Sequence, residues 1–243
     1  WFGLLQAERD KSLSASLLMG CAVYIKPFAF AAEFVRLLKR KWIALVTLAI
    51  PAVMAGLTIL ILGWQPFRAH IEFLKTLSGC QTAFWGNQSL LGALLRLFSD
   101  EPAMWYGFEQ DQTLRFIASG LLALFLIMAL VIQLRSRTTH SIATPSLWLN
   151  AVLLGLSLSW EHHAIFLLPA VAFLWTTRLT LYGAVVLVVA TLALSINLTP
   201  FFDESFLGRT LACVPALGRL ILFILLAAFH FSRSRLYKET IPL

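Results

Sequence analysis

Residues 43–62 read IALVTLAIPAVMAGLTILIL, a run of 20 residues without a single charged side chain. At a rise of about 1.5 Å per residue, a helix of this length spans the roughly 30 Å hydrocarbon core of a bilayer. The whole chain agrees, because 59% of its 243 residues are hydrophobic and only 13% are charged. About 25% of the residues in a soluble domain are charged. We expect an all-α integral membrane protein, and exclude a secreted disulfide scaffold, a disordered chain and an ordinary cytosolic enzyme.

Further apolar runs predict more membrane spans of the same kind, at residues 13–35, 116–134, 179–196 and 211–231. One more apolar stretch, residues 147–175, is interrupted by Glu161-His162-His163. It predicts either one long helix or two short helices of about 12–14 residues each, and the distribution of positive charge decides between them.

Cytoplasmic loops of membrane proteins carry an excess of lysine and arginine. The basic clusters of this chain follow the first, third and last spans: Arg36, Lys39, Arg40 and Lys41, then Arg135 and Arg137, then Arg233, Arg235 and Lys238. All three clusters fall on one side if residues 147–175 cross the membrane twice, whereas a single long helix would put the basic C-terminal tail outside. The sequence therefore predicts a polytopic helical bundle of about seven transmembrane helices. A re-entrant hairpin at Glu161 would give the same orientation and stays open.

The loop of about residues 63–115 is then predicted to lie on the outer side, with two amphipathic stretches along the membrane surface. Their apolar positions recur at helical spacing: Phe67, Ile71, Leu74 and Leu77, then Leu90, Leu91, Leu94, Leu95 and Phe98. Ser89 stands where it can cap the second helix. We treat residues 1–243 as a single transmembrane domain, the C-terminal part of a longer one, because Trp1 opens in mid-pattern.

The formal net charge of +7 does not indicate nucleic acid, because the basic residues sit beside apolar runs, as in proteins oriented in a membrane. The cysteines Cys21, Cys80 and Cys213 form no paired motif and indicate neither a disulfide nor a zinc site. We expect no metal, no cofactor and no nucleic-acid partner.

The motif Ser159-Trp160-Glu161-His162-His163 is the most informative polar segment. Ionisable side chains between two short apolar helices need a partner or water, which favours a functional site over a solvated turn. Adjacent histidines diverge by about 100° on a helix, so we expect only one of them to face the site.

The second polar motif is Asn87-Gln88-Ser89, and its Asn87 lies nine residues before Arg96. The amide side chains suit sugar hydroxyls and the guanidinium suits a phosphate, although a capped surface helix would explain the same residues. Lys26 and Arg219 lie inside predicted spans. For both, the simpler expectation is that the cation snorkels to the surface, and for Lys26 binding of an anion is the alternative.

These motifs, in the order Lys26-Pro27, a basic loop, Asn87-Gln88-Ser89-Leu90 with Arg96, and Ser159-Trp160-Glu161-His162-His163, resemble those of glycosyltransferase family 87. The resemblance implies the GT-C membrane fold and transfer of a sugar, usually mannose, from a polyprenyl-phosphate donor to a lipid or glycan acceptor. It implies a bacterial inner membrane with the active face toward the periplasm, and a role in the cell envelope. Membrane lipids are the remaining expected partners.

The resemblance also assigns roles to residues. Substrate binding is expected of Lys26, Asn87, Gln88, Arg96, Glu161, His162 and His163, with His162 favoured as the histidine that faces the donor. The catalytic base of the family is an aspartate in the first outer loop, which we expect upstream of Trp1. Glu8 and Asp10 belong to a later outer loop and do not replace it.

Two other classes of protein fit parts of the pattern. A polytopic transporter or lipid flippase would also have short interrupted helices and buried cations such as Lys26 or Arg219. A purely structural membrane subunit would leave Glu161-His162-His163 without a purpose. The polar motifs gather on the predicted outer side, which favours an enzyme that works there.

Overall fold

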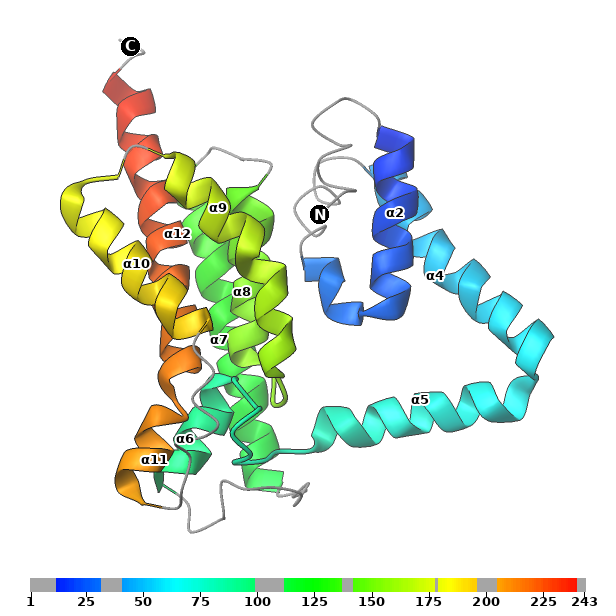
Figure 1. Cartoon of the computed structure of the whole chain (residues 1–243). Helices are drawn as coiled ribbons and strands as arrows, with labels where there is room; N and C mark the ends of the chain where they lie inside the picture. The colour runs from blue at the N-terminus through cyan, green and yellow to red at the C-terminus, as the bar shows by residue number, and fades with distance from the viewer. Residues whose placement is uncertain are drawn as a thin grey trace. The chain divides into compact units, whose positions relative to one another are not determined.

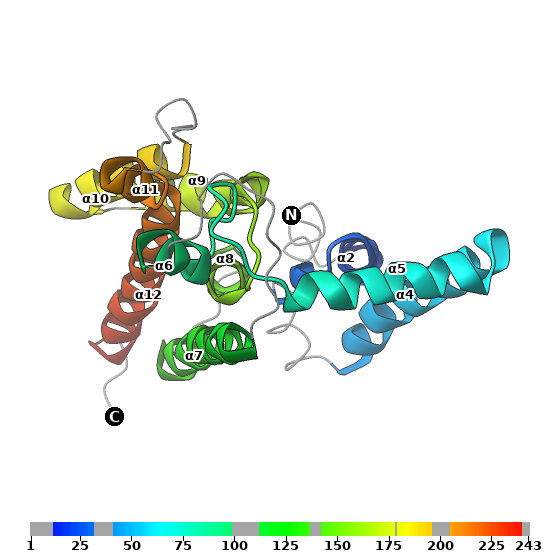
Figure 2. The same ribbon diagram turned by 90° about the horizontal axis from the view of Figure 1, so that it is seen from below.

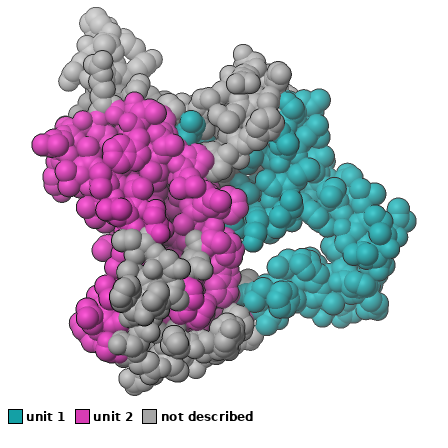
Figure 3. Space-filling view, in the orientation of Figure 1, with its two compact units in different colours: residues 1–77, 140–145 teal, residues 78–139, 146–243 magenta. Residues whose placement is uncertain are grey.

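The computed structural model describes residues 12–31, 41–98, 112–136, 142–177, 179–195 and 205–239. Within these ranges the chain forms helices and no β-strand, with one isolated bridge between Asn87 and Trp160. The all-α prediction is confirmed there. The chain divides into two compact units, residues 1–77 with 140–145 (unit 1) and residues 78–139 with 146–243 (unit 2), which Figure 3 colours separately.

Unit 1 contains α2 (Ser12–Ile25), the 3₁₀ turn η1 (Pro27–Ala29), α4 (Lys41–Leu62) and most of α5 (Trp64–Gly79) (Figure 1). Helices α2 and α4 pack closely at Gly20. A Cβ atom on this glycine would lie 2.5 Å from the Cβ of Ile50. Small residues allow this close approach between membrane helices, where van der Waals packing holds the pair together.

The first predicted span, residues 13–35, is interrupted. Helix α2 ends at Ile25, Lys26 adopts an extended backbone (φ −138°, ψ 93°), and η1 begins at Pro27. The proline ring clashes with the preceding residue in the helical conformation, so the residue before a proline favours an extended one. The described part of the span predicted at residues 13–35 is therefore not one continuous helix.

Three helical segments among the described residues are long and apolar enough to cross a membrane: Leu45–Leu62, Gln112–Ser136 and Phe206–Ser232. They coincide with the spans predicted at 43–62, 116–134 and 211–231. Large apolar side chains such as Phe116, Ile127 and Leu134 lie exposed on α7 (Gln112–Ser136), as expected of a surface that faces lipid. The chain is a membrane protein by these features, and its seven crossings stay a prediction.

The interrupted stretch 147–175 forms two short helical segments. Helix α8 (Ala143–Gly155) ends before a turn at residues 156–160, and the 3₁₀ turn η2 (Glu161–Leu167) then leads into α9 (Leu168–Thr176). The next apolar segment, α10 (Leu181–Ser195), is also short. The break thus lies at the polar motif, as the two-helix interpretation expects.

Unit 2 is built around α12 (Val214–Glu239) and α8. Gly218 of α12 lies against α10, where an added Cβ atom would come within 2.9 Å of the Cβ of Ala193. Phe223 of α12 meets Phe125 of α7 edge-on, with ring centroids 5.5 Å apart. Helix α8, seen nearly end-on in Figure 2, is buried along almost its whole length. These helices form the frame for the two polar motifs.

Candidate functional site

The two polar motifs of the sequence meet in unit 2. The backbone N–H of Gln88 donates to the carbonyl oxygen of Ser159 over 2.6 Å, and Asn87 pairs with Trp160 in the isolated bridge. The backbone N–H of Ser159 donates to Oδ1 of Asn87 over 2.9 Å. We call this meeting of residues 81–89 with residues 157–160 the motif joint. The sequence places both motifs at the site but gives no sign that they touch.

Asn87 is the centre of the motif joint and is fully buried. Its Nδ2 donates to the carbonyl oxygens of Thr82 and Ser157, each over 3.0 Å. An added Cβ atom on Gly92 would lie 2.6 Å from this Nδ2, so the space for the amide exists only because residue 92 is glycine. The amide groups of Asn87 thus bind protein and shape the turn.

The two residues after Asn87 are also buried and have different tasks. Nε2 of Gln88 donates to the carbonyl oxygen of Trp85, while its Oε1 accepts from no group among the described residues. Ser89 caps α6 (Leu90–Phe98), because its Oγ accepts from the backbone N–H of Gly92 over 3.0 Å. The predicted N-cap and the predicted amphipathic helix are both confirmed.

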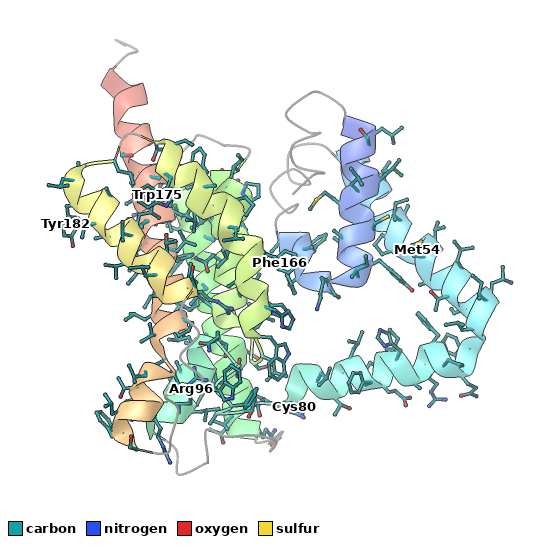
Figure 4. All side chains as sticks on the ribbon, in the orientation of Figure 1. Met54, Cys80, Arg96, Phe166, Trp175 and Tyr182 are labelled. Atoms are coloured by element: carbon teal, nitrogen blue, oxygen red, sulfur yellow. The ribbon has the colours of Figure 1, made fainter. Side chains whose placement is uncertain are left out.

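Arg96 of α6 lies beneath this turn with no exposed surface. Its Nη1 donates to the carbonyl oxygens of Phe84 and Asn87, each over 2.8 Å, and its Nε and Nη2 have no acceptor in the described part of the chain. Figure 4 labels Arg96 and also Cys80, where the loop that precedes α6 begins. Burial lowers the pKa of Arg96 below its ordinary value, and nearby Cys213 acts in the opposite direction. The guanidinium still keeps its charge at neutral pH.

Arg219 of α12 also contacts the motif joint. Its Nη1 donates to the carbonyl oxygen of Gln88 over 3.0 Å and to Oγ of Ser159 over 2.5 Å, and its Nη2 donates to the carbonyl oxygen of Trp160 over 3.0 Å. It is as completely buried as Arg96. The expectation that Arg219 snorkels to the surface is therefore wrong. An arginine inside an apolar membrane helix is energetically costly without a partner, so its presence in the sequence indicates buried acceptors.

The motif joint thus lies against two buried positive charges, Arg96 and Arg219. Their acceptors are backbone carbonyl groups and one hydroxyl, and no described carboxylate forms an ion pair with either guanidinium. Charges in a low-dielectric interior act over longer distances than charges in water. The region is therefore attractive to an anion.

The two histidines stand immediately after the motif joint, in η2. The ring of His162 is exposed, the ring of His163 is 95% buried, and the two rings meet edge-on at 4.5 Å. The backbone N–H of His163 donates to the carbonyl oxygen of Trp160. Of Glu161 the structure describes the backbone alone. His162 is thus the histidine that an external ligand can reach.

Lys26, the remaining residue expected at the site, belongs to unit 1. It is half-buried at the break between α2 and η1, and the described contacts of the motif joint do not include it. The acidic residues Glu8 and Asp10 lie outside the described residues, and so do four of the basic residues used to predict orientation: Arg36, Lys39, Arg40 and Arg137.

A groove of about 180 Å³ lies next to the histidines, between α10 and the segment formed by η2 and α9. It is lined by Ala164, Ile165, Leu168, Val171, Thr191, Leu194 and Ser195. The hydroxyls of Thr191 and Ser195 donate to carbonyl oxygens of their own helix, each over 2.7 Å. The groove is consequently apolar and suits a hydrocarbon chain.

The family model of glycosyltransferase family 87 matches residues 1–159. This part of the chain includes Lys26, Asn87-Gln88-Ser89 and Arg96, and it ends at Ser159, before the histidines and Arg219. No curated protein and no solved structure matches the chain.

Proposed function

The chain belongs to glycosyltransferase family 87, and from this premise we propose that it transfers a sugar, usually mannose, from a polyprenyl-phosphate donor to a lipid or glycan acceptor. The GT-C membrane fold is part of the same proposal. The transporter or flippase alternative has no match to support it.

The proposal rests on the motif joint, which lies against the buried guanidinium groups of Arg96 and Arg219. Loss of the sugar leaves negative charge on the donor phosphate, and fixed hydrogen-bond donors that face this charge accelerate such a reaction. His162 is exposed directly beside the motif joint. We assign it the donated hydrogen bond to the leaving phosphate, with the charge of Arg96 favouring the approach of the anion. Lys26 of unit 1 stays a proposed substrate-binding residue.

The other residues of the proposed site act on the sugar side. Oε1 of Gln88 is a buried acceptor without a described partner, and we assign it to a sugar hydroxyl. Asn87 stabilises the turn that contains Gln88. Glu161 and His163 are the remaining proposed substrate-binding residues. The catalytic base is not among these residues, so the set serves binding and leaving-group stabilisation.

We propose that the donor lipid binds in the apolar groove between α10 and the segment formed by η2 and α9. In this proposal a prenyl chain lies in the groove and its phosphate lies at the start of η2, where His162 stands. Binding from the membrane also explains why a soluble nucleotide-binding domain is not needed for this chemistry.

Donor identity is tested with membranes that contain the full-length protein. Radiolabelled polyprenyl-phosphate mannose should give labelled product, while a nucleotide-linked mannose should give none once synthesis of the lipid donor is blocked. Product formed from the nucleotide sugar alone would contradict the proposal.

Orientation is tested with single cysteines in a variant that lacks the native ones. We propose a bacterial inner membrane with the active face toward the periplasm. A cysteine at Thr76 on α5 should then react with a membrane-impermeant reagent from the periplasm, and one at Arg135 at the end of α7 only from the cytoplasm. Both positions are exposed. Reaction of both from the same side would contradict the orientation.

A further inference from the structure

Arg219 is a buried cation that the proposed set of substrate-binding residues does not include. It lies in α12, more than 130 residues along the chain from Gln88, and contacts both polar motifs at once. A second contact fixes its own position, because Nδ2 of Asn150 in α8 donates to the backbone carbonyl oxygen of Arg219 over 2.9 Å. The side chain is therefore anchored at its base and at its tip.

The planar fork of a guanidinium suits this arrangement. Nη1 donates to the carbonyl oxygen of Gln88 and to Oγ of Ser159, while Nη2 donates to the carbonyl oxygen of Trp160. One rigid group thus fixes the separation of three acceptors. A lysine ammonium is a point charge on a flexible stem and does not reproduce the fork. Buried acceptors that lose a charged donor are left unsatisfied, which destabilises their arrangement.

We propose that Arg219 is a positioning residue for the lipid-phosphate donor. It holds Gln88 and the start of η2 in register, so that His162 and the acceptor of Gln88 face one ligand. Because Nη1 and Nη2 of Arg219 already donate to Gln88, Ser159 and Trp160, Arg219 acts through these residues and does not contact the donor itself. The inference rests on the proposed function, since it concerns the donor site of that reaction.

The test compares Arg219→Lys with Arg68→Lys in the full-length protein, each reconstituted with donor and acceptor lipids. Arg68 lies on α5, exposed and paired with Glu72, and provides the matched control. We expect Arg219→Lys to raise the KM for the polyprenyl-phosphate donor about tenfold and to leave the KM for the acceptor unchanged. Arg68→Lys should change neither value.

A role in folding alone predicts a different result. Arg219→Lys would then lower the amount of active enzyme and the maximal rate while both KM values stay at the wild-type level, and this outcome would overturn the inference. An unchanged donor KM with an unchanged rate would overturn it as well.

A second variant covers the case in which Arg219→Lys does not fold. Ser159→Ala removes only the hydroxyl acceptor of Nη1 and keeps every backbone acceptor. We expect a donor KM about threefold above wild type, and an unchanged value overturns the inference. A wild-type protein that transfers nothing from the lipid donor would refute the proposed function itself, and the inference with it.

Discussion

The surroundings of the motif joint in unit 2 and helix α5 of unit 1 both contain arginine and histidine, but the two regions use these residues in opposite ways. Arg68 and Glu72 of α5 form an exposed ion pair at 2.8 Å, with side chains 60% and 58% exposed, and His70 is exposed on the same helix. Arg96 and Arg219 are fully buried and bind backbone carbonyl groups. The comparison teaches that burial and non-local partners, not residue type, distinguish the candidate site.

The largest expected difference between the two regions concerns their histidines. His162→Ala in the full-length protein should lower the rate of sugar transfer by about 10²–10³-fold, because a donor to the leaving phosphate is lost. His70→Ala should leave the rate unchanged, since His70 lies on α5, outside the proposed site. Initial rates with saturating lipid donor measure both variants. Equal rates for the two variants would remove the assigned role of His162.

A smaller difference is expected in stability. Asn87→Ala removes the two donors to Thr82 and Ser157 and the acceptor of Ser159, and should lower the free energy of unfolding by about 1–3 kcal/mol. Thr76→Ala on α5 removes an exposed hydroxyl and should change stability by less than about 0.5 kcal/mol. Thermal melting in detergent compares them. A stable Asn87→Ala variant would show that the motif joint does not depend on this amide.

The smallest effect is expected for the exposed ion pair itself. Arg68→Ala should cost at most about 1 kcal/mol, and the cost should shrink further in high salt because exposed charges are screened. Melting temperatures at low and high ionic strength measure it. A large loss that salt does not change would mean that Arg68 has a buried partner in the assembled protein.

Local patterns predicted much of this fold. The period of the apolar residues indicated α5 and α6, the position of Ser89 indicated its cap, and Glu161-His162-His163 indicated the break between α8 and η2. Each of these features depends on neighbours within a few residues, so a sequence contains the information directly.

Two features escaped prediction for different reasons. Helix α2 ends at Ile25, just before Pro27. The proline is a visible signal for this end, but the long apolar run of residues 13–35 outweighed it in the prediction. Arg219 binds backbone carbonyl groups of residues 59–131 positions away, and backbone acceptors leave no mark in side-chain spacing. The same holds for the contact between Asn87 and Ser159, which lie 72 positions apart in the chain.

The central claim is that the motif joint and His162 recognise a lipid-linked phosphate. Thermal melting of the purified full-length protein with polyprenyl phosphate, and with the matching polyprenol, tests it without turnover. A ligand that binds the folded state raises the melting temperature. Polyprenyl phosphate should raise it in the wild type and in His70→Ala but much less in His162→Ala, and polyprenol should have little effect. Equal shifts for the two lipids, or a full shift in His162→Ala, would contradict the account.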